Sequence, residues 1–195
     1  MSITTETIKE LRDKTGVSIM HCKKALEEAE GNLGKALVIL QKKSGAIATK
    51  KADRKLSSGT IASYLHTGGT VGVLVEVACE TDFVARNEDF QKFAYDLAMH
   101  IAAMNPTFLT IDEVAEEDKA TALEVFKKEV EDKSFDMQKK ILNGKMDAYF
   151  KDKILLTQTY IKDPDMSIDD LIKSAIQKFG ENIRVIRYTR YSIGS

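Results

Sequence analysis

The stretch Val71-Gly72-Val73-Leu74-Val75-Glu76-Val77-Ala78-Cys79 decides the fold, because a valine or a cysteine recurs at every second position. This alternation predicts a central β-strand with an apolar face. Leu74 and Ala78 on the opposite face are also apolar, which indicates that both sides of the strand are covered. The strand leads directly into Glu80-Thr81-Asp82-Phe83-Val84-Ala85-Arg86-Asn87. A loop at the end of a central strand commonly carries functional residues.

Two further segments complete a small sheet. Residues 60–66 also alternate, and the paired glycines of Thr67-Gly68-Gly69-Thr70 accept the positive φ values that a tight hairpin turn requires. Residues 183–191 predict a last strand that runs antiparallel in the same sheet. The expected sheet is therefore antiparallel and three-stranded.

Helical patterns fill most of the remaining chain. Asn87 and Ser167 are expected to cap two helices whose apolar residues recur at helical spacing. Their inward-facing residues are Phe90, Phe93, Ala94, Leu97, Ala98 and Ile101 in the first helix, and Leu171, Ile172, Ala175, Ile176 and Phe179 in the second. Residues 111–151 predict two charged amphipathic helices that are separated near Lys133 and Ser134.

The N-terminal residues 1–50 predict three short helices that pack as a small bundle. Their caps are expected at Thr4 or Thr5, at Ser18 and at Asn32. The predicted fold class is α+β. A three-helix module over residues 1–50 and a basic linker over 51–58 precede a core over 59–195, in which helices cover the antiparallel three-stranded sheet.

Composition is typical of a globular cytosolic protein. The chain has 195 residues, of which 43% are hydrophobic and 30% charged, and its net charge is −1. No apolar run approaches the length of a membrane span, and the first five residues lack a signal-peptide core. Cys22 and Cys79 match no metal-binding spacing and are expected to be reduced, buried thiols. We therefore expect a cytoplasmic location.

The densest basic segment lies between residues 42 and 55. Its cations are Lys42, Lys43, Lys50, Lys51, Arg54 and Lys55, and only Asp53 opposes them. Such a run can contact phosphates, so an RNA-associated adaptor is one hypothesis for function. A solvated helix end or linker is the more frequent explanation, because no aromatic side chain is interleaved.

The loop at residues 80–87 places a carboxylate beside an aromatic ring. Asp82 and Phe83 fall on one short helical turn that Thr81 is expected to cap. Two arrangements of Phe83 are open at this point. Its side chain projects outward and enters a partner protein, or it begins the next helix and packs inward.

Side chains for bond-making chemistry are not grouped in this sequence. The three histidines His21, His66 and His100 are scattered, and no phosphate loop follows Gly68-Gly69. Two carboxylates, at Glu80 and Asp82, are weak evidence for a metal site. We expect no enzyme activity, no cofactor and no bound metal.

Three segments carry a family resemblance. They are the loop 80–87, the stretch Leu11-Arg12-Asp13-Lys14-Thr15-Gly16-Val17-Ser18-Ile19-Met20-His21-Cys22-Lys23-Lys24-Ala25-Leu26, and the stretch Lys178-Phe179-Gly180-Glu181-Asn182-Ile183-Arg184-Val185. In this order they resemble the motifs of the elongation factor Ts family, the nucleotide-exchange factors for elongation factor Tu. The resemblance spans nearly the whole chain. It implies that the N-terminal module is ubiquitin-associated-like.

The resemblance also implies a partner and the residues that contact it. Phe83 would enter a hydrophobic slot in the GTPase domain of elongation factor Tu and disturb its phosphate loop and Mg²⁺ site. The implied partner-binding residues are Thr81, Asp82, Phe83 and Val84 in the loop, and Arg12, Ile19 and Met20 in the N-terminal module. The family commonly has methionine at the position of Ile19 and aspartate at that of His21. This chain keeps the apolar contact but changes the charge beside it.

Assembly is the last expectation. Longer members of the family carry two related core halves, whereas this chain has one hairpin, one signature loop and one closing strand. The resemblance implies that short members form a homodimer, which would bind two molecules of elongation factor Tu. The alternative is a monomer in which the helices of residues 111–151 cover the sheet. We expect no membrane contact and no direct nucleic-acid contact.

Overall fold

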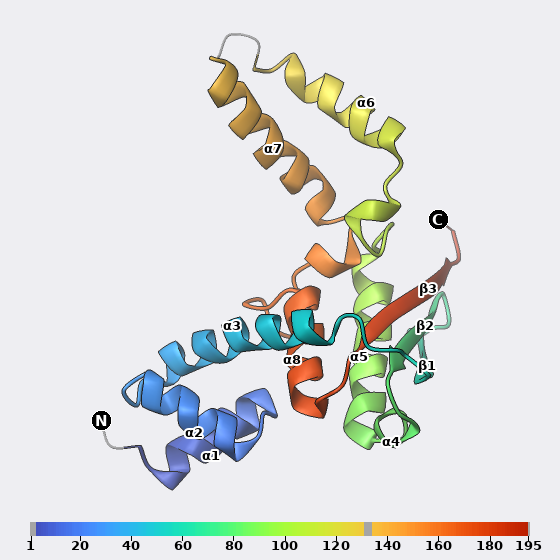
Figure 1. The fold of residues 1–195 in the computed structure, drawn as a ribbon. Coiled ribbons are helices and arrows are strands. Elements are labelled where there is room, and N and C mark those ends of the chain that lie inside the picture. The colour runs from blue at the N-terminus through green and yellow to red at the C-terminus, as the bar shows by residue number, and fades with distance from the viewer. Residues whose placement is uncertain (1–2, 131–133, 195) are drawn as a thin grey trace.

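The computed structural model describes residues 3–130 and 134–194, and within them the fold is α+β (Figure 1). Eight α-helices, two short 3-10 turns and one three-stranded sheet make up these described residues. The predicted fold class is confirmed.

The sheet has the order β1-β2-β3, and both pairs of neighbouring strands are antiparallel. Strand β1 spans Ser58–Leu65, β2 spans Val71–Cys79 and β3 spans Arg184–Ser192. The hairpin between β1 and β2 turns at Gly68 and Gly69, whose φ values are 92° and 72°. The paired glycines therefore serve the turn as predicted.

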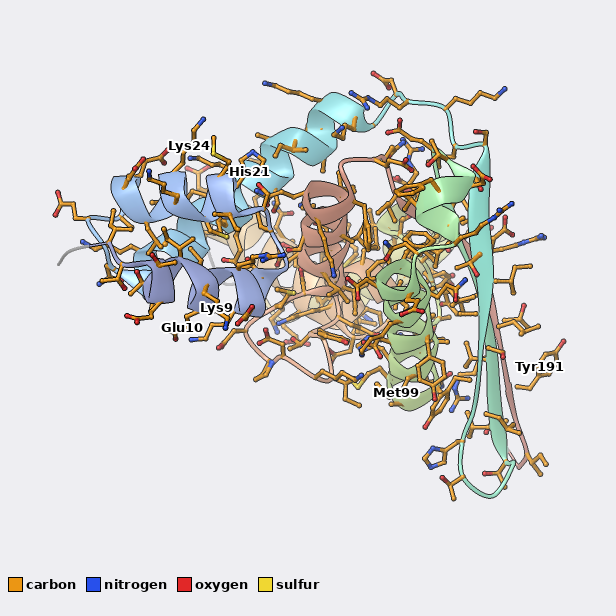
Figure 2. The ribbon with its side chains drawn as sticks, turned by 90° about the horizontal axis from the view of Figure 1, so that it is seen from below. Lys9, Glu10, His21, Lys24, Met99 and Tyr191 are labelled. Atoms are coloured by element: carbon orange, nitrogen blue, oxygen red, sulfur yellow. The ribbon has the colours of Figure 1, made fainter. Side chains whose placement is uncertain are left out.

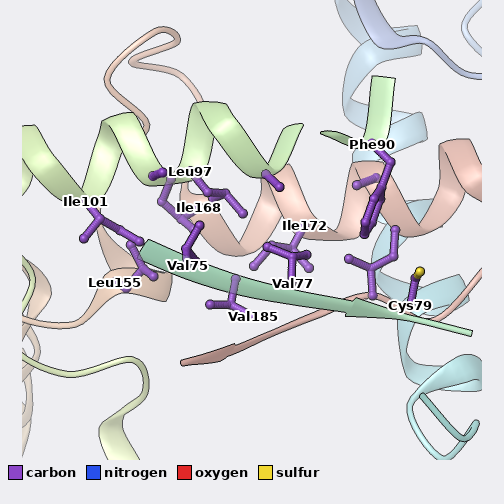
Figure 3. Packing of buried hydrophobic residues seen from close by; sticks show 14 of the residues in the cluster. Val75, Val77, Cys79, Phe90, Leu97, Ile101, Leu155, Ile168, Ile172 and Val185 are labelled. Carbon is purple, nitrogen blue, oxygen red and sulfur yellow. The ribbon is translucent and has the colours of Figure 1, made fainter. Parts of the chain in front are cut away.

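One face of the sheet is covered by two helices. Helix α5 spans Glu88–Met104 and α8 spans Ile168–Phe179, and Asn87 and Ser167 cap them as predicted. Figure 3 shows how their apolar side chains pack over the buried valines of β2. Leu97, Ile168, Val75 and Val77 are fully buried in this cluster, which is the main hydrophobic core.

The opposite face of the sheet is open. In Figure 2 the strands are seen edge-on, and Tyr191 points away from all the helices drawn. Leu74 is 51% exposed, and Leu65 and Tyr191 are each 70% exposed. The expectation that both faces are covered, drawn from Leu74 and Ala78, is therefore wrong at Leu74, although Ala78 is buried. The physical reason is that α5 and α8 lie on the same side of the sheet.

Three N-terminal helices surround a smaller core. Helix α1 spans Thr5–Thr15, α2 spans Ile19–Glu28 and α3 spans Leu33–Lys51. The side chains of Thr4, Ser18 and Asn32 each accept a hydrogen bond from a backbone N–H in the first turn. The small core consists of Leu11, Val17, Cys22, Ala25, Leu26, Ala29, Ala36 and Leu40.

Helix α3 is longer than the short helix that the sequence predicts. It has 19 residues and continues past Gly45 into the first residue of the predicted linker, Lys51. Ile47 and Ala48 near its end pack against the main core. Helix α3 thus contacts both hydrophobic clusters.

Two helices project from the body as an antiparallel hairpin (Figure 1). Helix α6 spans Glu116–Lys127 and α7 spans Phe135–Lys151, with a small cluster of buried residues at their base. Ser134 lies at the start of α7 as predicted, while Lys133 lies outside the described residues. The hairpin points away from the sheet. Helices α6 and α7 therefore do not cover the open face of the sheet, which the monomer alternative expected of residues 111–151.

Candidate partner-binding site

The signature loop folds as a four-residue helix directly after the central strand. Helix α4 spans Asp82–Ala85, and Thr81 caps it by accepting a hydrogen bond from the Val84 N–H at 3.4 Å. The Phe83 side chain is 80% exposed. Of the two arrangements open from the sequence, the structure therefore shows the outward one.

The turn has an inner and an outer side. Val84 and Ala85 are buried in the main core, whereas Thr81, Asp82 and Phe83 are exposed. Val84, one of the predicted contact residues, is 6% exposed and anchors the turn from inside. Asp82 lies 3.3 Å from Arg86, but both side chains are strongly exposed. This ion pair therefore stabilises the turn little.

A buried thiol lies beneath the turn. The Cys79 Sγ donates a hydrogen bond to the Thr81 carbonyl oxygen at 3.2 Å. Burial raises the pKa of the Cys79 thiol, and the charge of Glu181 acts in the same direction. Cys79 therefore remains protonated and supports the loop. Cys22 is likewise free and buried, as expected from the sequence.

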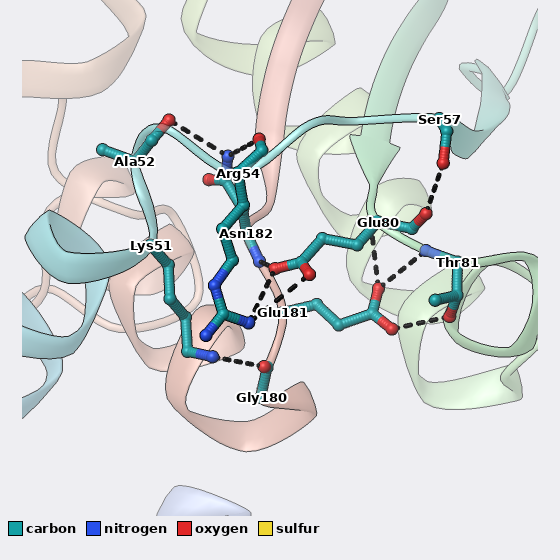
Figure 4. Close-up of polar contacts among 9 residues, drawn as sticks. All are labelled: Lys51, Ala52, Arg54, Ser57, Glu80, Thr81, Gly180, Glu181 and Asn182. Carbon is teal, nitrogen blue, oxygen red and sulfur yellow. Dashed lines mark hydrogen bonds and ion pairs between the residues drawn. The ribbon is translucent and has the colours of Figure 1, made fainter.

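Two family motifs that are distant in sequence meet at the turn (Figure 4). The Glu181 carboxylate accepts hydrogen bonds from the Glu80 and Thr81 N–H groups, each at 3.0 Å, and from the Thr81 hydroxyl at 2.6 Å. In return, the Glu80 carboxylate accepts the Asn182 N–H at 2.6 Å. Glu181 and Asn182 belong to the third family motif, but the sequence predicted no role for either residue. An acidic residue just after the helix-ending Gly180 was the available signal.

The linker after α3 joins the same polar cluster. Lys51 Nζ donates to the Gly180 carbonyl oxygen at 2.6 Å, and Arg54 lies 3.5 Å from the Glu80 carboxylate. The Asn182 side-chain amide donates to the carbonyl oxygens of Ala52 and Arg54 at 3.3 and 3.0 Å. Lys51 and Arg54 of the predicted basic run are therefore engaged within the chain.

The other predicted contact residues lie on the N-terminal helices. Arg12, Ile19 and Met20 are all exposed on α1 and α2. The Ser18 hydroxyl is 3.2 Å from His21 Nδ1, so the histidine that departs from the family pattern contacts the cap of α2. Helices α1, α2 and α4 all lie toward the lower end of the molecule in Figure 1, away from the hairpin.

In the parts of the chain that the structure describes, no group of three or more His, Cys, Asp or Glu side chains could hold a metal ion. None of the helices in these parts is long and apolar enough to cross a membrane. A cavity of about 780 Å³ lies at the base of the hairpin, lined by Met146, Phe150 and Ile154 among others. It does not include the signature turn.

An exposed aromatic ring on a surface turn that hydrogen bonds and buried side chains hold in place is typical of a protein that acts by binding another protein. Comparison with known proteins narrows this class. The family described as Elongation factor TS matches residues 6–195. Elongation factor Ts from Thermotoga neapolitana and that from Thermotoga maritima are 45% and 46% identical over 194 residues, which cover 100% of this chain and 98% of each relative. Elongation factor Ts from Prochlorococcus marinus is 46% identical over 196 residues, covering 99% of this chain and 90% of that protein.

This chain therefore belongs to the elongation factor Ts family, a family of translation elongation factors.

Proposed function

We propose that this protein is a guanine-nucleotide exchange factor that binds elongation factor Tu in its GDP-bound form and promotes GDP release. The observation that carries the proposal is the 80% exposure of Phe83 on a turn whose next two residues, Val84 and Ala85, are buried. An apolar ring held outward on a fixed base is suited to enter a slot in a partner. We propose that entry of Phe83 disturbs the phosphate-binding and Mg²⁺-binding region of elongation factor Tu.

The proposed mechanism is a coupling between two binding events. A factor that binds the nucleotide-free partner more tightly than the GDP-bound partner weakens GDP binding by the same ratio. No bond is made or broken in this scheme. The protein accordingly needs no catalytic side chain or cofactor, and we propose that it is not an enzyme.

Phe83 does not account for the whole effect. Burying one phenylalanine contributes about 1.5–3 kcal/mol, and about 1.4 kcal/mol corresponds to a factor of ten. Further contacts are therefore required. We assign them to Thr81 and Asp82 beside the ring, and to Arg12, Ile19 and Met20 on the N-terminal helices, which are exposed and lie toward the same end of the molecule.

We also propose that two copies of the chain pair through the open face of the sheet. The exposed Leu65, Leu74 and Tyr191 support this, because apolar side chains grouped on an exposed face commonly mark a protein–protein contact. A two-fold pair would present two Phe83 turns and bind two molecules of elongation factor Tu. A cytoplasmic location would follow from this role.

The decisive experiment measures release of labelled GDP from purified elongation factor Tu. We expect substoichiometric amounts of this protein to accelerate release. Unchanged release together with RNA binding that weakens steeply with salt would favour the adaptor hypothesis for residues 42–55 instead. The structure gives that hypothesis less support, because Lys43, Lys51 and Arg54 already contact Glu28, the Gly180 carbonyl oxygen and Glu80.

A further inference from the structure

The short helix that carries Phe83 cannot be stable by itself. Four residues do not complete the nucleus of an isolated helix, whose formation is unfavourable in water. An exposed phenylalanine ring would also gain free energy by folding back onto the protein. The anchors on the inner side, Val84 and Ala85, fix the C-terminal half of the turn. Its N-terminal half needs a separate restraint.

Glu181 supplies this restraint from another part of the chain. Strand β2 ends at Cys79, so the sheet does not use the N–H groups of Glu80 and Thr81. One oxygen of the Glu181 carboxylate accepts both of them at 3.0 Å. Hydrogen bonds to a charged acceptor are stronger than those between neutral groups. One side chain, 100 residues away in sequence, therefore fixes the backbone that leads into the turn.

The other carboxylate oxygen orients the cap. A threonine hydroxyl has one hydrogen to donate and two lone pairs that accept. The Thr81 hydroxyl donates its hydrogen to Glu181 Oε1 at 2.6 Å, which leaves a lone pair free for the Val84 N–H at 3.4 Å. Glu181 thus selects the hydroxyl orientation in which Thr81 can cap α4.

Glu181 is itself held in place. It follows Gly180, which has a φ of 73° and ends α8. The next residue, Asn182, donates its N–H to Glu80 at 2.6 Å and its side-chain amide to the linker carbonyls. The two glutamates therefore cross, each accepting hydrogen bonds from the segment that carries the other (Figure 4). A crossed pair of this kind resists displacement of either segment.

We propose that Glu181 is a positioning residue that presents Phe83 to the partner, acting through the Thr81 cap. The inference rests on the proposed exchange function for its consequence, but its structural part can be tested without the partner. Glu181 makes its hydrogen bonds with Glu80 and Thr81 and is not one of the residues proposed to contact the partner, so we propose that its effect reaches the partner through the geometry of the turn.

The first test needs no activity. The chain contains no tryptophan, so Phe83→Trp places a single indole on the turn. We expect Glu181→Gln to increase the fast, nanosecond part of the indole's anisotropy decay, because the amide that replaces one oxygen donates where an acceptor is needed. The matched control is Glu129→Gln, which removes an exposed glutamate paired with Lys145 on the hairpin. Equal decays in the Glu181→Gln and control proteins would overturn the proposal.

The second test measures GDP release from elongation factor Tu. We expect Glu181→Gln to slow stimulated release by roughly tenfold, with the control unchanged. In a Phe83→Ala background the same substitution should have almost no further effect, because the two residues act as a unit. An equal effect in both backgrounds would show that Glu181 acts elsewhere and would refute the positioning role.

Two variants of Thr81 test the capping step independently, in case Glu181→Gln fails to fold. Thr81→Val removes the hydroxyl but keeps the shape, and it should reproduce the loss seen with Glu181→Gln. Thr81→Ser keeps the hydroxyl and should lose much less exchange activity than Thr81→Val. Equal rates for the two variants would contradict the capping step. If the unmodified protein fails to stimulate release at all, the proposed function fails, while the anisotropy experiment still decides the positioning role.

Discussion

At the scale of single residues, Phe83 is expected to contribute to partner binding but not to the stability of the fold. A side chain that is 80% exposed contributes little to the free energy of unfolding. The same ring contributes to a complex when the partner buries it. Substitutions at this position should therefore change binding and leave the fold intact.

We expect Phe83→Ala to slow stimulated GDP release by about tenfold to a hundredfold, which is the effect of losing one buried phenylalanine at an interface. The unfolding midpoint in denaturant should hardly change. Phe135→Ala is a matched control, because Phe135 on the hairpin is also 80% exposed. Normal exchange by Phe83→Ala would remove Phe83 from the mechanism, and failure to fold would show that it belongs to the core.

A different residue, His100, forms hydrogen bonds that connect the core to the segment after the hairpin. It is fully buried, its Nε2 is 2.9 Å from Gln158 Oε1, and its Nδ1 accepts the Ile161 N–H at 3.3 Å. This pattern requires a neutral ring, since a protonated Nδ1 accepts no hydrogen bond. Burial lowers the pKa of His100, although the Gln158 contact opposes this shift.

The lowered pKa predicts a loss of stability in mild acid. Below about pH 6.5 the unfolded chain binds a proton on this histidine and the folded chain does not. The free energy of unfolding should therefore fall by up to about 1.4 kcal/mol per pH unit until the folded pKa is reached. Denaturant unfolding between pH 5 and 8 measures this slope. His100→Gln should flatten it and the exposed His66→Gln should not, so equal slopes in the two variants would argue against this assignment.

At the scale of elements, sequence patterns within one helical turn predicted the helix caps correctly. Features that depend on contacts between distant segments were not predicted. Ser18, Asn32, Asn87 and Ser167 cap helices as predicted, because a cap depends on neighbours within one turn. The extension of α3 past Gly45 depends instead on packing against α8, which outweighs helix propensity. The contacts of Glu181 join residues that are 100 positions apart. No local pattern reveals such a contact.

The position of α3 leads to a test of domain organisation. We propose that residues 1–50 form a module that is joined through 51–58 to a core over 59–195. Because Ile47 and Ala48 pack on the main core, a truncation that removes residues 1–50 should lower core stability more than one that removes residues 1–32. Both truncations should weaken association with elongation factor Tu, since both remove Arg12, Ile19 and Met20. Denaturant unfolding and a binding titration measure the two effects, and undiminished affinity would exclude these residues from the interface.

At the scale of the whole molecule, the single chain leaves an apolar surface uncovered. The two helices that pack on the sheet occupy one face, and the hairpin extends away from it (Figure 1). Across the open face, Leu74 of β2 lies between Ser63 of β1 and Thr189 of β3 in the strand register. A second copy of the chain, related by a two-fold axis, could cover this face with the same set of residues.

We therefore expect a homodimer, and the open face provides the means to test it. Light scattering under reducing conditions should give a mass near twice the 21.8 kDa of one chain at micromolar concentration, with dissociation on dilution. A disulfide is not needed, because Cys22 and Cys79 are both buried.

Leu74→Asp places an unpaired charge at the centre of the face and should yield the monomer, since burying that charge is costly. The matched control Val125→Asp changes an exposed valine on α6 and should leave the dimer intact. A single-chain mass for the unmodified protein across this range would contradict pairing, and a dimer that survives Leu74→Asp would place the interface elsewhere.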